Sequence, residues 1–337
     1  MKLNEICSKG KSSLRQKDVF NDGPYIVYGA SGVIGTTSDY QNEIPYVAIV
    51  KDGAGVGRAN ACEPMTSVLG TMQALIPNPN VERDYLLHLV RSLRLGEGFS
   101  GSTIPHIYFK DYGRIEVPLP PLGAQKRIVS QLGLVEAQIT QAEAQIEQLD
   151  RLVKSRFVEM FGDPTNNKFD FPVEKLGGLG LLERGKSKHR PRNAPELRGG
   201  PNGPYPLIQT GDIANAGTYL ATYEDTYTEL GLLQSRIWPK GTLCITIAAN
   251  IAKTSILAID ACFPDSVVGF TTNGKVTNLF MHYWFSFFQS ILEKQAPQAA
   301  QKNINLRILQ NLDVIAPPLA LQQEFADFVA QVDKSRF

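Results

Sequence analysis

One phrase occurs twice in this chain, and it restricts the fold more than any other feature. The residues Val-Pro-Leu-Pro-Pro-Leu-Gly-Ala-Gln at 117–125 return as Val-Ile-Ala-Pro-Pro-Leu-Ala-Leu-Gln at 314–322. In each copy an apolar run typical of a strand meets two prolines, and an apolar, glutamine-rich helical pattern follows. Proline fixes φ, lacks an N–H donor and is tolerated in the first turn of a helix. The two copies therefore predict strand-to-helix junctions, and a chain of two similar units that each end in a helix.

Other segments recur in the same order. Asp-Gly-Pro-Tyr at 22–25 matches Asn-Gly-Pro-Tyr at 202–205, and the largely apolar segment 84–92 matches 282–290. No single match is specific, because Gly-Pro-Tyr is ordinary turn chemistry. Their common order indicates domain duplication, since the period is far too long for a solenoid. We expect a mixed α/β (α+β) fold in each of two similar domains, separated by long coiled-coil helices.

Between the two units lies a heptad pattern. Apolar residues recur at alternating steps of four and three, and the residues between them are polar or charged. Such a narrow stripe indicates a long helix that pairs with another helix, whereas a helix in a globular core, the alternative, usually has a wider apolar face. Phe-Gly-Asp-Pro at 161–164 predicts the end of this helix. The residues expected to pack in the helix pair are Ile128, Leu132, Val135, Ile139, Ile146, Leu149, Val153 and Phe157 in this helix and Phe325, Phe328 and Val332 in the second one.

The second helix is short in this sequence, which stops at Phe337. We therefore expect part of the first helix's stripe, either between Ile146 and Phe157 or at the opposite end, to lie beyond the reach of a partner helix within the chain. A second copy of the chain or another subunit would then cover it, which predicts possible self-association.

Composition sets limits on the class of protein. The chain has 337 residues and a formal net charge of +1, and no apolar run approaches the roughly 20 residues of a membrane span. Its first residues lack the apolar stretch of a secretory signal. We expect a cytoplasmic protein that does not enter a membrane. The four cysteines are scattered without Cys-x-x-Cys spacing, so we predict reduced thiols and no metal site.

The proline junction and the long helix together resemble a known family. Leu-Pro-Pro-Leu at 119–122, Gln125, Ile128, Leu132 and Glu-Met-Phe-Gly-Asp-Pro at 159–164 are similar to motifs of the specificity (S) subunits of type I restriction-modification systems. The resemblance covers the layout of the whole chain. It implies target-recognition domain 1 at 1–117, a central conserved helix at 118–164, target-recognition domain 2 at 165–316 and a shortened distal helix at 317–337.

The resemblance implies a DNA sequence-specificity subunit that is not catalytic alone. Each recognition domain would read one half of a bipartite site in double-stranded DNA. Two antiparallel helices would space the domains and dock two modification (methyltransferase) subunits, and restriction (translocase) subunits would complete the complex. S-adenosylmethionine, ATP and Mg would be bound by those partners, and no cofactor by this chain. The repeat agrees with this, because two similar domains on a stiff spacer suit a ligand with a fixed helical repeat.

The first candidate for DNA contact is the basic segment 183–198. Lysine and arginine side chains there would neutralise phosphates, which gives affinity without sequence information. A solvated loop is the alternative interpretation. The candidate residues in this segment are Lys186, Lys188, His189, Arg190 and Arg192.

Two further pairs of segments occupy similar places in both units. A glycine-rich turn at 51–58 follows an apolar strand-like run, and its counterpart is 248–253. The polar segments 96–106 and 295–303 both precede a proline junction, and Asn and Gln can pair with adenine. Tight turns need glycine equally, and polar segments are often surface loops, so both interpretations stay open. The candidate residues are Lys51, Arg58, Ser102, Thr103, His106, Lys253, Gln301, Lys302 and Asn303.

Enzymatic functions find little support. The glycines of Gly-Ala-Ser-Gly-Val-Ile-Gly at 29–35 do not have dinucleotide-binding spacing, and no serine lies in a Gly-x-Ser-x-Gly elbow. A metal-dependent nuclease built on Asp52, Asp212 and Glu224 is disfavoured, because acids near lysines are common on any surface. We predict no catalytic residue. The rival to a DNA reader is a protein-interaction scaffold that dimerises through the central coiled coil.

Overall fold

The computed structural model describes residues 1–98, 105–188, 191, 194–248, 251–288, 291 and 304–335. The chain divides into two compact units, Met1–Ala142 and Glu143–Phe337, which are considered separately below. Within the described residues, none of the helices combines the length and apolar character needed to span a membrane.

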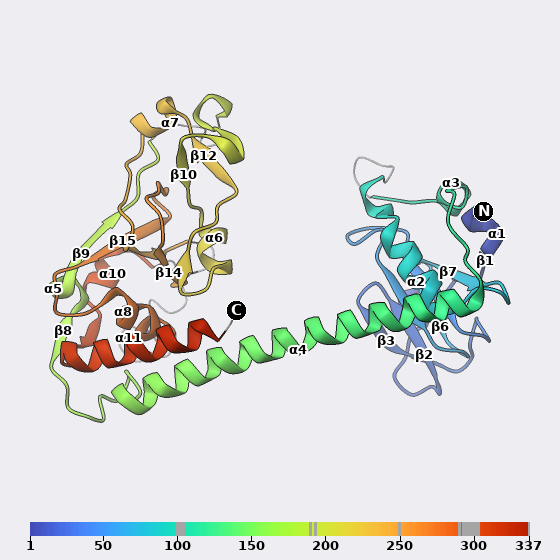
Figure 1. Cartoon of the computed structure of the whole chain (residues 1–337), viewed down its shortest axis with the longest axis horizontal. Helices are drawn as coiled ribbons and strands as arrows, with labels where there is room; N and C mark the ends of the chain where they lie inside the picture. The colour runs from blue at the N-terminus through green and yellow to red at the C-terminus, as the bar shows by residue number, and fades with distance from the viewer. Residues whose placement is uncertain are drawn as a thin grey trace. The chain divides into compact units, whose positions relative to one another are not determined.

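The first unit is built on a four-stranded antiparallel sheet (Figure 1). Its strands, in spatial order, are β1 (Cys7–Lys9), β7 (Met72–Pro77), β4 (Tyr46–Val50) and β5 (Ala59–Cys62). A smaller sheet has the order β3 (Gly32–Thr37), β2 (Tyr25–Gly29) and β6 (Ser67–Val68). The helical elements are α1 (Leu3–Ile6), η1 (Gln16–Asp18), α2 (Arg83–Ser92), η2 (Leu95–Glu97), α3 (Phe109–Tyr112) and the first part of α4 (Leu122–Phe161).

The central strand β4 explains why five apolar residues follow one another in the sequence. Successive side chains of a strand point to opposite faces of its sheet. Val47 and Ile49 pack in the cluster formed with α1, α2 and α3, whereas Tyr46, Ala48 and Val50 pack in a second cluster with Val68 and Met72. Both faces of the sheet are therefore covered, which confirms the strand expected here.

The second unit repeats this plan with additions. Its five-stranded sheet has the order β11 (Tyr219–Leu220), β14 (Thr254–Leu257), β13 (Leu243–Thr246), β15 (Val267–Thr272) and β9 (Gly180–Arg184). Two-stranded sheets pair β10 (Tyr205–Leu207) with β12 (Asp225–Tyr227) and β8 (Val173–Lys175) with β16 (Asp313–Ile315). The helical elements are α5 (Leu176–Leu179), η3 (Pro195–Leu197), η4 (Gly200–Asn202), α6 (Thr210–Asn215), α7 (Glu229–Leu233), α8 (Asn278–Phe285), α10 (Leu306–Gln310) and α11 (Leu319–Lys334).

The two central sheets correspond strand by strand. The order β1-β7-β4-β5 of the first unit matches β9-β15-β13-β14 of the second, and all three contacts in each set are antiparallel. In β13, as in β4, alternate residues enter different clusters: Leu243 and Ile245 enter one and Cys244 the other. The duplication predicted from the repeated phrase is confirmed.

A buried glutamine fastens each proline junction to its own domain. The side chain of Gln125 accepts a hydrogen bond from the backbone N–H of Glu82 (2.8 Å) and donates to the carbonyls of Asn80 and Pro120. Gln322 repeats the pattern: it accepts from the N–H of Thr277 (2.7 Å) and donates to the carbonyls of Lys275 and Pro317. Both side chains are fully buried. The glutamine that the sequence repeats is thus a structural clamp.

The clamps correct one detail of the predicted alignment. Glu82 and Thr277 are the N-caps of α2 and α8, so these two helices begin at equivalent points. Matching segment 84–92 with 282–290 is therefore wrong by three residues. Apolar helices without a distinctive motif can be aligned in several registers, and only the cap contacts select one.

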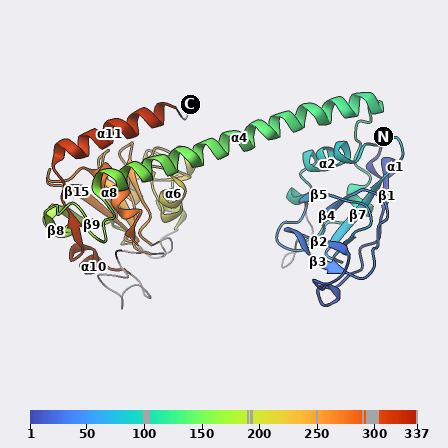
Figure 2. The ribbon, with the colours of Figure 1, turned by 90° about the horizontal axis from the view of Figure 1, so that it is seen from below.

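The helix α4 is continuous over 40 residues, as the heptad pattern predicts, and ends at Gly162, whose φ of 76° is the left-handed conformation of a C-terminal cap. Its C-terminal part packs in the core of the second unit, where Val153 and Phe157 are fully buried beside Phe325 of α11. The order of contacts, Phe161 with Phe325 and Arg156 with Phe328, shows that α11 runs antiparallel to α4 (Figure 2).

The apolar stripe of α4 is covered at one end only. Leu149 is partly buried and Val332 of α11 is buried in the same cluster. By contrast, the residues Ile128, Leu132, Val135, Ile139 and Ile146 are 36–53% exposed. Of the two stretches that the sequence left open, the one between Ile146 and Phe157 is excluded, since α11 packs there. The uncovered stretch is the opposite end.

The clamp predicts a local loss of stability. Gln322→Ala would leave the partly buried N–H of Thr277 without its acceptor, which costs about 1–3 kcal/mol of unfolding free energy. The neighbouring exposed Gln323→Ala is the matched control and should change stability by less than about 0.5 kcal/mol. Urea unfolding followed by tryptophan fluorescence measures this, because Trp238 and Trp284 both lie in the second unit. Equal midpoints for the two variants would contradict the clamp.

Candidate nucleic-acid interface

In the first unit, the turn after β4 has a shape that requires glycine. Gly53, Gly55 and Gly57 have φ values of 84°, 104° and 85°, in the left-handed region that L-residues rarely adopt. A Cβ on Gly57 would also lie 2.3 Å from the backbone nitrogen of Gly96. These glycines are explained by the turn itself. What the turn presents to solvent is Arg58, whose guanidinium donates to the carbonyl of Ala54 (3.1 Å).

The turn is joined to the segment that precedes the first proline junction. The N–H of Gly53 donates to the carbonyl of Pro105, and the N–H of Ile107 donates to that of Lys51. A hydrogen bond links the ring of His106 to the carboxylate of Asp52. Lys51 and His106, predicted from separate segments, are therefore brought together. Ser102 and Thr103 lie outside the described residues.

Partial burial lowers the pKa of Lys51, and the charge of Lys9 lowers it further. Because β1 and β4 both run antiparallel to β7, Lys9 at the end of β1 and Lys51 directly after β4 lie toward the same end of the sheet. Basic residues from two separate strands thus gather at one end of this sheet.

The first unit also has a basic residue, Lys11, that was not predicted. The N–H of Gly10 donates to the carbonyl of Ala74, just after β1, and the N–H of Gly185 donates to that of Val267, just after β9. The exposed Lys11 and Lys186 that follow are therefore equivalent. A repeated Gly-Lys-Ser tripeptide, at 10–12 and 185–187, was the signal that could have revealed Lys11.

In the second unit, strand register places the predicted cations at one end of the sheet. Thr246 of β13 pairs with Val267 of β15, next to the pairing of Val268 with Arg184 of β9. The exposed Lys186 and Lys188 follow β9, and the exposed Lys253 precedes β14 at the same end. His189, Arg190, Arg192, Gln301, Lys302 and Asn303 lie outside the described residues.

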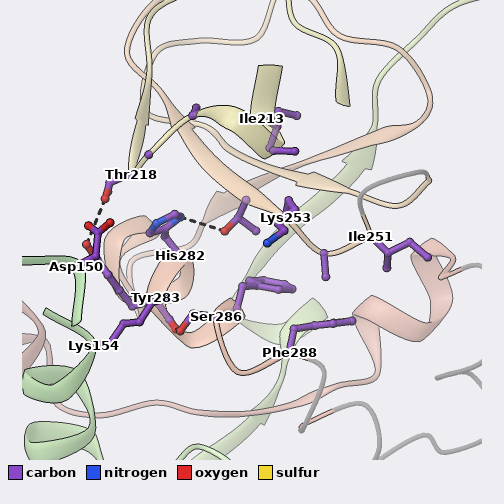
Figure 3. Close-up of a pocket in the computed structure, with 16 residues that line it drawn as sticks. Asp150, Lys154, Ile213, Thr218, Ile251, Lys253, His282, Tyr283, Ser286 and Phe288 are labelled. Atoms are coloured by element: carbon purple, nitrogen blue, oxygen red, sulfur yellow. Dashed lines mark hydrogen bonds between the residues drawn. The ribbon is translucent and has the colours of Figure 1, made fainter. Parts of the chain in front are cut away.

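Lys253 borders a groove of about 390 Å³ between β14, α8 and α4. The groove is also lined by Lys154 of α4 and by His282 of α8, whose Nδ1 lies 3.0 Å from the hydroxyl of Thr254 (Figure 3). Burial lowers the pKa of His282 to about 4, and the charge of Lys154 contributes. The imidazole is therefore neutral at pH 7. Neither residue was predicted, because a lone histidine and one lysine in a helix carry no sequence signal.

The described part of the chain shows neither a metal-binding cluster nor an exposed thiol. Among them, no three His, Cys, Asp or Glu side chains are grouped so that they could hold a metal ion. All four cysteines are buried and free, and burial raises the pKa of the Cys7 and Cys62 thiols to about 12. What each unit does offer is a set of exposed cations at one sheet end.

Comparison with known proteins gives a consistent result. The model of the family described as type I restriction modification DNA specificity domain matches residues 1–151 and again 170–336. The chain is 24% identical over 280 residues to a putative type I restriction enzyme MjaX specificity subunit of Methanocaldococcus jannaschii, a match that covers 77% of this chain and 63% of that protein. It is 24% identical over 263 residues to the type I restriction enzyme EcoBI specificity subunit of Escherichia coli, covering 69% and 54%.

The chain thus spans less than two thirds of the length of these two relatives. Among solved structures, the Type-I restriction-modification system S subunit from M. genitalium matches 100% of this chain and 89% of its own, with a TM-score of 0.57 and 14% identity. At that identity the likeness shows a shared fold.

The lowered pKa of His282 predicts a pH dependence of stability. Below the ordinary histidine pKa of 6.5 the unfolded imidazole gains a proton that the folded one resists, so stability falls as pH drops from about 6.5 towards 4. The full loss is on the order of 3 kcal/mol. Urea unfolding between pH 7.5 and 4.5 measures it, and His282→Gln should flatten the dependence. An identical pH profile for that variant and the wild type would contradict the assignment.

Proposed function

Because the chain belongs to the family of type I restriction modification DNA specificity domains, we propose that it is the subunit that reads the DNA sequence for such a system. Each of the two units recognises one part of a split site in double-stranded DNA. The observation that carries this proposal is that the family model matches the chain twice, once over each repeat.

The cationic sheet ends support the proposal in physical terms. Lys11, Lys51 and Arg58 in the first unit, and Lys186 and Lys253 in the second, follow or precede equivalent strands. Phosphate contacts from such residues supply affinity and fix the register of a protein on the duplex. Base-reading side chains then supply the specificity. A net charge of only +1 is compatible with this, because the cations are locally concentrated.

Partners would supply the chemistry. In this proposal the exposed part of the α4 stripe is a docking surface for modification (methyltransferase) subunits, two per complex, and restriction subunits join them. S-adenosylmethionine, ATP and Mg are bound by those subunits, and this chain contributes no catalytic group. The site of action is the cytoplasm, where the DNA is.

The rival scaffold that does not bind DNA is not favoured. Both repeats match a DNA specificity model, and the curated relatives are specificity subunits. Self-association through α4 is compatible with either function.

The first test is the salt dependence of duplex binding, with the modification subunit of the same locus supplied. Affinity should fall linearly on a log–log plot against salt. The double variant Lys186→Gln, Lys188→Gln should reduce the slope by about 2, because each lysine releases about one counterion. The exposed Lys240→Gln is the control, with an unchanged slope. Binding that is absent or insensitive to salt would refute the DNA-reading function.

A second test addresses sequence specificity directly. Methylated adenines in DNA from a host that carries this locus should reveal one split motif, and deletion of the gene should abolish it. Methylation that survives the deletion would contradict the assignment.

A further inference from the structure

The groove beside Lys253 has an equivalent in the first unit. The carbonyl of Arg58 accepts from the N–H of Val50 (2.8 Å), and that of Lys253 accepts from the N–H of Thr246 (3.0 Å). Arg58 and Lys253 thus each close the turn after the central strand and directly precede the next strand, β5 or β14. Arg58 borders a groove of about 460 Å³, and the groove at Lys253 measures about 390 Å³.

The other wall of each groove is formed by equivalent helices, α2 and α8. In the first unit it is the C-terminal end of α2, with Arg91 and Arg94, and in the second unit it is the end of α8, with Ser286. Counted from the equivalent caps Glu82 and Thr277, Arg91 and Ser286 occupy the same position. Each repeat thus has a groove between the start of β5 or β14 and the end of α2 or α8, and in the second unit α4 and α6 line it as well.

Both grooves carry more cations than anions. In the first unit Arg58, Arg91 and Arg94 line the groove with Glu97 as the lining acid. The guanidinium of Arg91 is held by the carbonyl of Ala59 and lies 3.7 Å from Glu136, and that of Arg94 lies 3.6 Å from Glu97. The carbonyl contact orients the guanidinium group of Arg91 without neutralising it. Ion pairs at these distances leave donor N–H groups for a ligand.

In the second unit the cations come from different elements. Lys253 precedes β14 and Lys154 belongs to α4, and Asp150 is the lining acid. His282 stands between them as a neutral ring, and the hydroxyl of Thr254 is its partner at Nδ1. If that hydroxyl donates, the other ring nitrogen carries an N–H, which is a further donor for an anion. Figure 3 shows Lys253, His282 and Ser286 around the same space.

We propose that the two grooves are equivalent phosphate-binding sites, one in each unit, held by Arg58, Arg91 and Arg94 in the first and by Lys154, Lys253 and His282 in the second. A phosphate group presents several acceptor oxygens and no donor, which suits sites built from guanidinium, ammonium and imidazole N–H groups. The grooves are of the size that accommodates a nucleotide. The inference rests on the proposed function in one respect: the phosphate belongs to the DNA backbone.

The experiment uses the full chain and two independent readouts. The first is the salt slope of binding to a non-specific duplex. Lys253→Gln, Lys154→Gln and Arg94→Gln should each lower affinity roughly threefold to tenfold at low salt and reduce the slope by about 1. The exposed Lys240→Gln and Arg114→Gln are the matched controls for the two units. Tryptophan fluorescence verifies that the second-unit variants remain folded.

The second readout detects phosphate without DNA. Inorganic phosphate is titrated while the imidazole signals of the four histidines are followed by NMR, with His282→Gln used to assign the His282 signal. An anion next to His282 should raise its pKa and shift its signal, and Lys253→Gln should abolish the response.

The outcomes separate the two proposals. A phosphate response with reduced salt slopes supports backbone phosphate in both grooves. A phosphate response with unchanged slopes supports a phosphate site filled by a free nucleotide or phosphate. Unchanged slopes without a phosphate response overturn the proposal that the grooves bind phosphate. If the wild type still binds the duplex in that case, the proposed DNA-reading function stands. If the variants lose only their binding to the modification subunit, the grooves are contact sites for that subunit, and the inference is also overturned. Absence of any duplex binding refutes the proposed function, and the NMR titration then decides on the grooves alone.

Discussion

The buried glutamine at each proline junction is the contact on which the rest of the architecture depends. A glutamine amide offers one acceptor and two donors, and both Gln125 and Gln322 use them on backbone groups only. Each binds an N–H at the start of a helix, where backbone donors have no partner within the helix. Each also binds the proline-region carbonyl that leads into the next helix. Inside a protein such hydrogen bonds are strong, and a missing partner is costly. The direction in which α4 or α11 leaves its own domain is therefore fixed by one side chain.

The duplicated sheet accounts for where the exposed basic residues lie in each unit. In each unit the central turn and the end of the first strand lie at the same end of the sheet. Residues that are distant in sequence are therefore placed at that end. Lys51 and Lys9 come from separate strands, yet the charge of one lowers the pKa of the other. Lys186 and Lys253 are likewise placed at the same end of their sheet by the pairing of β9, β15, β13 and β14. A single fold plan, used twice, thus produces two cationic surfaces, as a reader of a split DNA site needs. The helix α4 adds an exposed apolar stripe.

Local patterns predicted local structure well. The heptad pattern predicted α4 and its end at Gly162, since helix periodicity and a glycine cap depend on neighbouring residues alone. The apolar runs at β4 and β13 were predicted for the same reason. The family assigned from the helix motifs is confirmed by the match to both repeats. By contrast, the alignment of α2 with α8 was wrong by three residues, because apolar spacing permits several registers. The sequence also left open which end of the α4 stripe is covered, because the residues that α11 reaches depend on how both helices pack in the second unit.

The sequence by itself determined the duplication, the long helix, the strand-to-helix junctions and the family, because each is written in short-range order or in repeated motifs. Only the tertiary structure decided which residues act together. The role of the repeated glutamine, the equivalence of Lys11 with Lys186, and the groove formed by Lys154, Lys253 and His282 all depend on contacts between segments far apart in the chain. Such contacts arise from strand register and helix packing, which are set by the cores of the two units.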